Sequence, residues 1–245
     1  MRDDVTLDDM ATCPVPPSRT GYDATRARVE TYFDRTATRT WERLTSDAPV
    51  SRIRQTVREG RDEMRALMLS RLPTDLTGAR VLDAGCGAGQ MTIELARRGA
   101  DVLATDISPS LVGIAERRMP ENLRKQVQFA AGDMLHPGLG RFDHVIAMDS
   151  LIYYSAEDIG RALASLEKRT ARTIVFTVAP RTRALMLMWY AGKLFPRSDR
   201  SPVMVPHEHE NLARAARQQG VSGLVRPVDR VSSGFYISQA MEVRS

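Results

Sequence analysis

The sequence predicts an α/β fold built on a mostly parallel, seven-stranded sheet that closes with an antiparallel hairpin. Two observations support this prediction. Beyond Leu76, short β-rich runs alternate with helical segments, which is the pattern of a parallel sheet with helices on both faces. Near the C-terminus, two more β-rich runs are joined only by "SSG", and so short a connection forces an antiparallel hairpin.

Composition limits the class of protein. The 245 residues suffice for one domain with appended segments, and 42% hydrophobic with 27% charged residues is typical of a globular protein. The first ten residues carry acids where a signal peptide would carry bases, so we expect a cytoplasmic location. Cys13 and Cys86 are too few for a disulfide framework. The net charge of +5 is spread along the chain and does not require a nucleic-acid partner.

The segment before the glycine-rich motif is predicted to be helical. Residues 1–20 contain three prolines among polar residues and are expected to form a disordered leader. Residues 21–75 are expected to form a helical arm with helices near 22–44 and 51–72. In the second helix, apolar residues recur on one face, while Arg52, Arg58, Arg61 and Arg65 fall mostly elsewhere.

Residues 76–245 are expected to form the main domain. The parallel strands are predicted near 79–84, 101–106, 127–130, 143–148 and 172–178, with helices near 89–99, 109–118 and 157–169. Residues 181–206 are too long and too mixed for a plain crossover, so we interpret them as an inserted cap. A helix near 208–219 then ends at Gly220, and the hairpin strands follow near 224–231 and 235–243.

The stretch "VLDAGCGAG" places Gly85, Gly87 and Gly89 directly after the first strand. Glycines at this point let the backbone turn sharply and approach a ligand closely. Gln90 occupies the position of the third glycine in the dinucleotide-binding fingerprint, which disfavours a nicotinamide or flavin cofactor. A Gly-Lys-Ser/Thr ending is missing as well, which excludes a P-loop.

Three acids at the ends of successive strands indicate the ligand. Asp83 precedes the glycines and suits an ammonium group, Asp106 ends the next strand and suits two ribose hydroxyls, and Asp133 suits an adenine amino group. Taken singly, each has a structural explanation as a turn or helix-cap residue. Together they predict S-adenosylmethionine. The predicted cofactor site is completed by Ile107, Met134, which would pack against the adenine ring, and Asp149.

The stretch "MDSLIYYS" follows the fourth strand, where the acceptor binds in such sheets. Tyr153 either donates a hydrogen bond to the acceptor or packs in the core, and we name it as a candidate catalytic residue. Neither an Asn-Pro-Pro-Tyr signature nor a cysteine nucleophile is present there. His207 and His209 lack the partners of a zinc site, so no protein-bound metal is predicted.

Longer stretches extend this interpretation to a family. "YFDRTATRTWERL", "LDAGCGAGQMTIELARRGADVLATDIS", "KLFPRSDRSPVMVPH" and "SSGFYISQAMEV" resemble the magnesium-protoporphyrin IX O-methyltransferases, and the resemblance covers about residues 22–245. It implies a Rossmann-like class I methyltransferase fold. It also implies methylation of one propionate of magnesium-protoporphyrin IX in (bacterio)chlorophyll biosynthesis, with S-adenosylhomocysteine as the second product. The magnesium then belongs to the substrate.

The resemblance also implies roles for the arm and for partners. The arm would fold over the cofactor as a lid, which makes Tyr32 the second candidate catalytic residue. The family often has histidine where this chain has Tyr153, so an imidazole role does not carry over. Contact with the porphyrin-binding subunit of magnesium chelatase is implied, and peripheral contact with the photosynthetic membrane stays open.

The chemistry of such a substrate directs attention to the cap. A propionate is ionised at neutral pH and needs positioning and exclusion of water rather than a strong base. Arginines too close to the reacting carboxylate would stabilise the ground state, so basic residues are expected to hold the unreacting propionate. The candidates are Arg181, Arg183, Lys193, Arg197 and Arg200 for this anchor, and Met188, Trp189 and Phe195 for the porphyrin wall.

Three alternatives remain at this point. The acceptor is another small molecule, such as a quinone precursor or a different carboxylic acid. The acceptor is RNA, which the lack of a lysine-rich stripe or an aromatic platform disfavours. The chain binds a porphyrin without turnover, which the complete set of three acids disfavours.

Overall fold

The computed structural model describes residues 20–34, 52–182 and 202–244. The strands are β1 (Arg80–Ala84), β2 (Asp101–Asp106), β3 (Val127–Ala131), β4 (Phe142–Ala147), β5 (Thr170–Pro180), β6 (Pro206–His207), β7 (Leu224–Ser233) and β8 (Tyr236–Arg244). The helices are α1 (Thr20–Tyr32), α3 (Arg52–Leu69), α4 (Gln90–Arg97), α5 (Pro109–Arg118), α6 (Ala156–Glu167) and α8 (His209–Gln218), with short 3-10 turns at Glu121–Gln126 and Pro137–Leu139.

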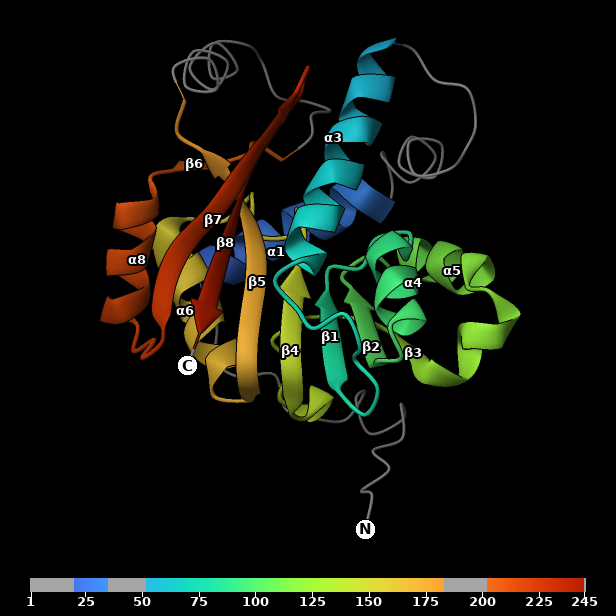
Figure 1. Cartoon of the computed structure of the whole chain (residues 1–245). Coiled ribbons are helices and arrows are strands. Elements are labelled where there is room, and N and C mark those ends of the chain that lie inside the picture. The colour runs from blue at the N-terminus through green and yellow to red at the C-terminus, as the bar shows by residue number, and fades with distance from the viewer. Residues whose placement is uncertain (1–19, 35–51, 183–201, 245) are drawn as a thin grey trace.

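The strands form one mixed sheet in the order β3-β2-β1-β4-β5-β8-β7 (Figure 1). Strands β1 to β5 pair in parallel, whereas β8 pairs antiparallel with both β5 and β7. The predicted α/β fold with seven strands and a C-terminal hairpin is confirmed. The two-residue strand β6, which pairs with β5, is an addition that the sequence pattern did not indicate.

The central strands are buried on both faces because helices cover both sides of the sheet (Figure 1). Val81 and Leu82 of β1 are fully buried, as are Val145 and Ile146 of β4. Strands of this kind appear in a sequence as continuous apolar runs rather than as alternating ones. The runs that predicted strands near 79–84 and 143–148 therefore reflect burial on two faces.

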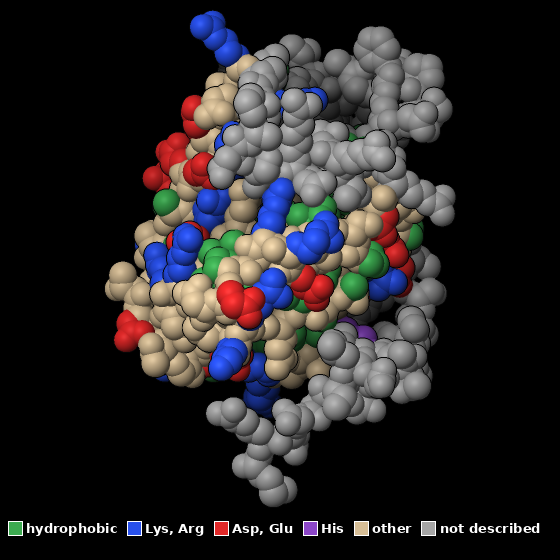
Figure 2. All heavy atoms as spheres, turned by 90° about the vertical axis from the view of Figure 1, so that its right-hand side faces the viewer, with side chains coloured by type: hydrophobic (Ala, Val, Ile, Leu, Met, Phe, Trp, Pro, Cys, Tyr) green, Lys and Arg blue, Asp and Glu red, His purple; other side chains and the backbone are tan. Residues whose placement is uncertain are grey.

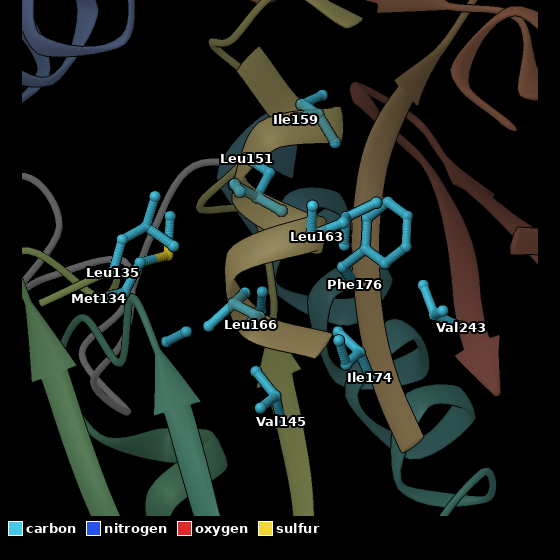
Figure 3. Close-up of a cluster of buried hydrophobic side chains, with 14 of the residues drawn as sticks. Met134, Leu135, Val145, Leu151, Ile159, Leu163, Leu166, Ile174, Phe176 and Val243 are labelled. Atoms are coloured by element: carbon cyan, nitrogen blue, oxygen red, sulfur yellow. The ribbon is translucent and has the colours of Figure 1, made fainter. Parts of the chain in front are cut away.

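Two hydrophobic cores lie on opposite faces of the sheet. On one face, Leu163 and Leu166 of α6 pack against Ile174 and Phe176 of β5 (Figure 3). On the other face, Met64 and Met68 of α3 join α4 and the strands in a second core. Burying one such side chain contributes about 1.5–3 kcal/mol, so the arm helix α3 is an integral part of the fold.

The arm helices lie at the carboxyl ends of the parallel strands, where α3 stands above β1 and β4 (Figure 1). Gly60 of α3 packs directly on the turn of the hairpin, because a Cβ atom at this glycine would lie 2.7 Å from the ring of Tyr236. The N-terminal arm and the C-terminal hairpin thus meet above the sheet. This arrangement positions the site described below.

Several predicted segments lie outside the described residues. These are residues 1–19 of the leader, residues 35–51 of the arm, which include the second half of the helix predicted near 22–44, and residues 183–201 of the cap. The described ends of the cap are held by backbone hydrogen bonds from Arg181 to His207 and from Val205 to Ile152. None of the helices in the described part of the chain is long and apolar enough to cross a bilayer.

Candidate functional site

A cavity that is partly open to solvent lies at the carboxyl ends of strands β1 to β4. The loops after these strands form its floor, and α1 and α3 supply part of its wall. All three acids predicted from the sequence, Asp83, Asp106 and Asp133, line it. The structure therefore brings the three acids together at one cavity, and their contacts with a cofactor stay predictions.

The glycine loop forms part of the floor of the cavity, and its three glycines have different surroundings. Gly85 has φ 88°, and a Cβ atom on it would lie 2.3 Å from the Cβ atom of Ser150, so the loop passes very close to the end of β4. Gly87, at φ 54°, has nothing within 4 Å of its Cβ position, which leaves its backbone open toward the cavity. Gly89 is not among the lining residues and instead packs on Ala115 of α5.

Asp106 and Asp83 are buried carboxylates. Asp106 accepts hydrogen bonds from the backbone N–H groups of Gly87 at 2.8 Å and Ser108 at 2.9 Å, and burial raises its pKa to about 6. Burial also raises the pKa of Asp83 to about 7, although its carboxylate accepts a hydrogen bond from Thr92 at 2.6 Å. A nearby cation or additional donors would stabilise both carboxylates, and a ligand can supply them.

Two buried hydroxyls indicate a polar ligand as well. The Oγ1 atom of Thr105 and the Oγ atom of Ser150 are buried and have no hydrogen-bond partner among the described residues. Both residues line the cavity. Because an unpaired buried hydroxyl costs about 1–3 kcal/mol, these two atoms fit a ligand that offers several polar groups.

Side chains of the arm helix α1 bind the carboxylate of Asp133. This carboxylate accepts hydrogen bonds from the hydroxyl of Tyr22 at 2.9 Å, from Arg26 at 2.9 Å and from the backbone of Leu135 at 2.9 Å. The ring of Tyr22 stacks on Tyr154 with a centroid distance of 4.9 Å. A carboxylate offers about four acceptor positions, so a further donor can still bind, and the adenine contact of Asp133 stays a prediction. Ile107 and Met134 line the cavity beside these groups.

The far end of α1 also reaches the cavity. Phe33 lines it and makes edge contacts with Tyr153 at 6.3 Å and with Tyr32 at 5.2 Å between ring centroids. The next residue, Asp34, accepts a short hydrogen bond from the hydroxyl of Ser108, at the start of α5. Tyr32 is not among the lining residues, so its catalytic role stays a prediction.

Tyr153 lines the cavity from the loop after β4. Burial and the neighbouring charge of Asp149 raise its pKa above the ordinary value of tyrosine, so the phenol stays protonated at neutral pH. It is therefore a hydrogen-bond donor to the cavity rather than a base. Its catalytic role remains a prediction.

Asp149 occupies a special backbone position. Its φ of 56° is left-handed, which is rare outside glycine. Its carboxylate forms an ion pair with Arg61 and accepts hydrogen bonds from Tyr236 at 3.0 Å and Thr177 at 3.2 Å. The predicted contact between Asp149 and the cofactor stays a prediction, since these protein groups surround the carboxylate.

Most of the residues predicted to bind the substrate lie outside the described part of the chain. Arg181 forms an ion pair with Glu208 at 3.2 Å and does not line the cavity. His207, part of the histidine pair considered above, is buried and binds the backbone oxygen of Tyr154 at 2.9 Å. The remaining candidates lie outside the described residues, namely Arg183, Met188, Trp189, Lys193, Phe195, Arg197 and Arg200.

Several lining residues were missed by the sequence analysis, among them Tyr22, Arg26, Arg61 and Arg65. For the two arm arginines of α3 a signal existed, because their spacing of four places them on one face of a helix. For Tyr22 none existed. Its partner Asp133 lies 111 positions away, and only the folded chain brings them together.

The comparisons with known proteins identify the family. The family model "Magnesium-protoporphyrin IX methyltransferase C-terminus" matches residues 147–245, and a general "Methyltransferase domain" model matches residues 81–172. The magnesium-protoporphyrin O-methyltransferase of Rhodobacter capsulatus is 62% identical over 91% of this chain and 98% of its own length. The enzyme of that name from Synechocystis is 31% identical over 89% of this chain and 95% of its own length.

A solved structure shows the same relationship. The crystal structure of magnesium protoporphyrin IX methyltransferase from Synechocystis with bound S-adenosylhomocysteine superposes with a TM-score of 0.74 at 31% identity, covering 90% of this chain and 100% of that one. A ubiquinone biosynthesis O-methyltransferase of Xanthomonas oryzae is 36% identical over only 50% of this chain. The longer matches thus extend beyond the cofactor-binding region to the arm and the hairpin.

Proposed function

Since this chain belongs to the magnesium-protoporphyrin O-methyltransferase family, we propose that it methylates one propionate carboxylate of magnesium-protoporphyrin IX. The methyl donor is S-adenosylmethionine, and the products are the monomethyl ester and S-adenosylhomocysteine in (bacterio)chlorophyll biosynthesis. The magnesium is part of the substrate. The observation that carries the proposal is the 62% identity over nearly the full length of both chains.

The residues of the cavity fit this cofactor. Asp106 would hold the ribose hydroxyls, Asp83 the ammonium group, and Asp133 with Met134 the adenine. The open backbone of Gly87 fits a close approach of the ligand, and the unpaired hydroxyl of Thr105 offers a further polar contact. When bound, the cofactor supplies a methyl group on an electron-poor sulfonium.

The protein's own contribution to catalysis is positioning in a dry site. The acceptor carboxylate is already ionised at neutral pH, so no residue has to remove a proton. Apolar lining residues such as Phe33, Leu111 and Met148 exclude water from the reacting groups. Tyr153, whose phenol stays protonated, donates a hydrogen bond that orients the carboxylate.

The proposal extends to two contacts outside the cavity. The substrate would be received from the porphyrin-binding subunit of magnesium chelatase, and the protein would touch the photosynthetic membrane peripherally. The family relationship supports the first contact, and the net charge of +5 supports the second. The face that carries α5 shows acidic and basic side chains intermixed (Figure 2), so it is a poor candidate for an anionic membrane or nucleic acid.

A labelling experiment separates the proposal from its rivals. The protein is incubated with methyl-labelled S-adenosylmethionine and, in separate reactions, with magnesium-protoporphyrin IX, zinc-protoporphyrin IX and a ubiquinone precursor. We expect label in the porphyrins and none in the quinone precursor. Label in the quinone precursor alone would replace the substrate, and porphyrin binding without any product would reduce the protein to a binding protein.

A further inference from the structure

Three segments that are far apart in the sequence meet at the carboxylate of Asp149. Arg61 comes from the arm helix α3, Tyr236 from the first residue of β8, and Thr177 from β5. The backbone N–H of Asp149 also donates to the Thr177 hydroxyl at 2.7 Å. The side chains of Arg61 and Asp149 are mostly buried, at 16% and 9% exposed, and both residues line the cavity. This arrangement fixes a guanidinium in the cavity wall.

The pair lies on the side of the cavity away from the predicted ribose and adenine contacts. Asp106 and Asp133 follow β2 and β3, whereas Asp149 follows β4, on the opposite side of β1 in the strand order. Tyr153, four residues after Asp149 in the chain, lines the same cavity as Arg61 and Asp149. The charge of Arg65, one helical turn further along α3, acts to lower the pKa of Asp83, which lies at the methionine end of the predicted cofactor site.

We propose that Asp149 is a positioning residue that fixes and neutralises Arg61, and that Arg61 orients the acceptor carboxylate for methyl transfer. This inference rests on the proposed function, because it requires an acceptor that carries a carboxylate. The Tyr236 hydroxyl and Thr177 hold Asp149 in turn. The C-terminal hairpin therefore affects the position of the acceptor indirectly, because Tyr236 holds Asp149 and Asp149 holds Arg61.

Charge balance explains why a paired arginine suits this reaction. The acceptor carboxylate loses its negative charge as the methyl group arrives. A lone guanidinium would therefore bind the substrate more strongly than the transition state and would slow the reaction. A guanidinium that is neutralised by a carboxylate keeps its directional N–H donors without adding a net charge. The pair of Arg61 and Asp149 has this property.

Two substitutions are expected to change the kinetics in opposite ways. In Arg61→Gln, the KM for magnesium-protoporphyrin rises by about 10-fold or more, since a hydrogen bond from a charged group is lost. In Asp149→Asn, Arg61 is no longer neutralised, so the porphyrin KM falls while kcat drops by about 10-fold. Asparagine tolerates a positive φ, and this substitution therefore preserves the backbone at Asp149.

Further variants test the coupling. The double variant Arg61→Gln with Asp149→Asn is expected to recover part of the kcat lost in Asp149→Asn alone, because no unbalanced charge remains. Tyr236→Phe is expected to shift kcat and KM in the direction of Asp149→Asn, but less. Arg97→Gln, which removes an exposed ion pair with Glu94 on α4, serves as the control and leaves both parameters unchanged.

Binding of S-adenosylhomocysteine, measured by calorimetry, separates the outcomes. The inference predicts a Kd within about 2-fold of wild type in Arg61→Gln and Asp149→Asn, because it assigns Asp149 to Arg61 in place of the cofactor contact predicted from the sequence, and Arg61 to the acceptor. It is overturned if this Kd rises as much as kcat/KM falls, or if both variants raise the porphyrin KM. A wild-type protein that binds S-adenosylhomocysteine but does not methylate the porphyrin would instead refute the proposed function itself.

Discussion

The guanidinium of Arg26 and the carboxylate of Asp133 form an ion pair at 2.9 Å, although 107 positions separate them in the chain. This pair ties the arm helix α1 to the loop after β3. Beyond the other end of this helix, Asp34 accepts a hydrogen bond from Ser108, at the start of α5. Helix α1 is therefore fastened at both ends over the cavity, and its attachment can be weakened at a single position.

Arg26→Gln is expected to loosen α1. Removing the guanidinium costs the ion pair and leaves Asp133 with one donor fewer. Backbone hydrogen exchange in α1 should accelerate by about 10-fold, which corresponds to about 1.4 kcal/mol. Arg28→Gln on the same helix is the matched control, because Arg28 is exposed and donates to Thr25 of its own helix. Equal exchange rates in the two variants would show that the pair does not hold the arm.

The two buried acids predict how the ligand-free protein responds to pH. Burial raises the pKa of Asp83 to about 7 and that of Asp106 to about 6, from ordinary values near 4. Their contribution to stability is therefore fully present below about pH 4 and is lost as the pH rises through 6 and 7. The Tm of the ligand-free protein should therefore fall as the pH rises from about 4 to 7. Bound S-adenosylhomocysteine should make this fall smaller, because its ammonium group pairs with a carboxylate.

The double variant Asp83→Asn with Asp106→Asn tests the assignment. Without the two titrating groups, the Tm of the ligand-free protein should depend less on pH between 5 and 8 than in wild type. The same pH dependence in both proteins would show that other groups cause it.

The close approach of Gly85 to Ser150 predicts a rescue. In Gly85→Ala, the added methyl group meets the Ser150 side chain, and the left-handed φ becomes strained. Each effect lowers the free energy of unfolding by about 1–3 kcal/mol. Ser150→Gly in the same chain should remove the clash and restore part of the loss in urea unfolding. Gly113→Ala, at a roomy position inside α5, is the control and should be neutral or slightly stabilising.

If Gly85→Ala and its double variant with Ser150→Gly unfold at the same urea concentration, the contact with Ser150 does not explain this glycine. The loss would then come from backbone strain alone.

Glu242 is expected to respond to pH in the opposite direction from Asp83 and Asp106, because its contribution to stability is lost as the pH falls. It is fully buried and bonded to Arg71 at 2.9 Å, with Arg226 and Arg244 beside it. Desolvation acts to raise its pKa, but the arginines outweigh it and the pKa is lowered. Its contribution is therefore present above the ordinary value near 4 and is lost as the pH falls through the lowered value.

Glu242→Gln should lower the free energy of unfolding at pH 7 by about 1–3 kcal/mol. The difference from wild type should shrink below about pH 4, where the glutamate becomes protonated. Glu121→Gln removes an exposed pair with Arg124 and should change stability by less than about 1 kcal/mol. A pH-independent loss in Glu242→Gln would indicate a packing defect instead.

Local patterns in the sequence were sufficient to predict the strands of the sheet. Each predicted strand overlaps an observed one, because buried parallel strands form continuous apolar runs bounded by turns. The proposed roles of Asp106, at the end of β2, and Gly87, in the loop after β1, rest on the tendency of ligands to bind at the carboxyl ends of strands in open α/β sheets. Strand β6 was not predicted, since two residues are too few to show any periodicity.

The wall of the cavity was not predictable in the same way. Tyr22, Arg61 and Tyr236 reach the site from the arm and the hairpin, and their partners Asp133 and Asp149 are remote in sequence. Contacts of this kind depend on how elements pack rather than on local pattern. Gly89 shows the converse case, because the motif assigned it to the cofactor whereas the structure packs it against α5.

We propose that this cavity joins a methyl group to a carboxylate of the porphyrin. The most direct measurement follows label from methyl-labelled S-adenosylmethionine into magnesium-protoporphyrin IX and then treats the product with alkali. A carboxylate ester is expected, so one label per porphyrin should be incorporated and then released by the alkali. Label that resists alkali, or a porphyrin that stays unlabelled while S-adenosylhomocysteine binds the protein, would contradict the account.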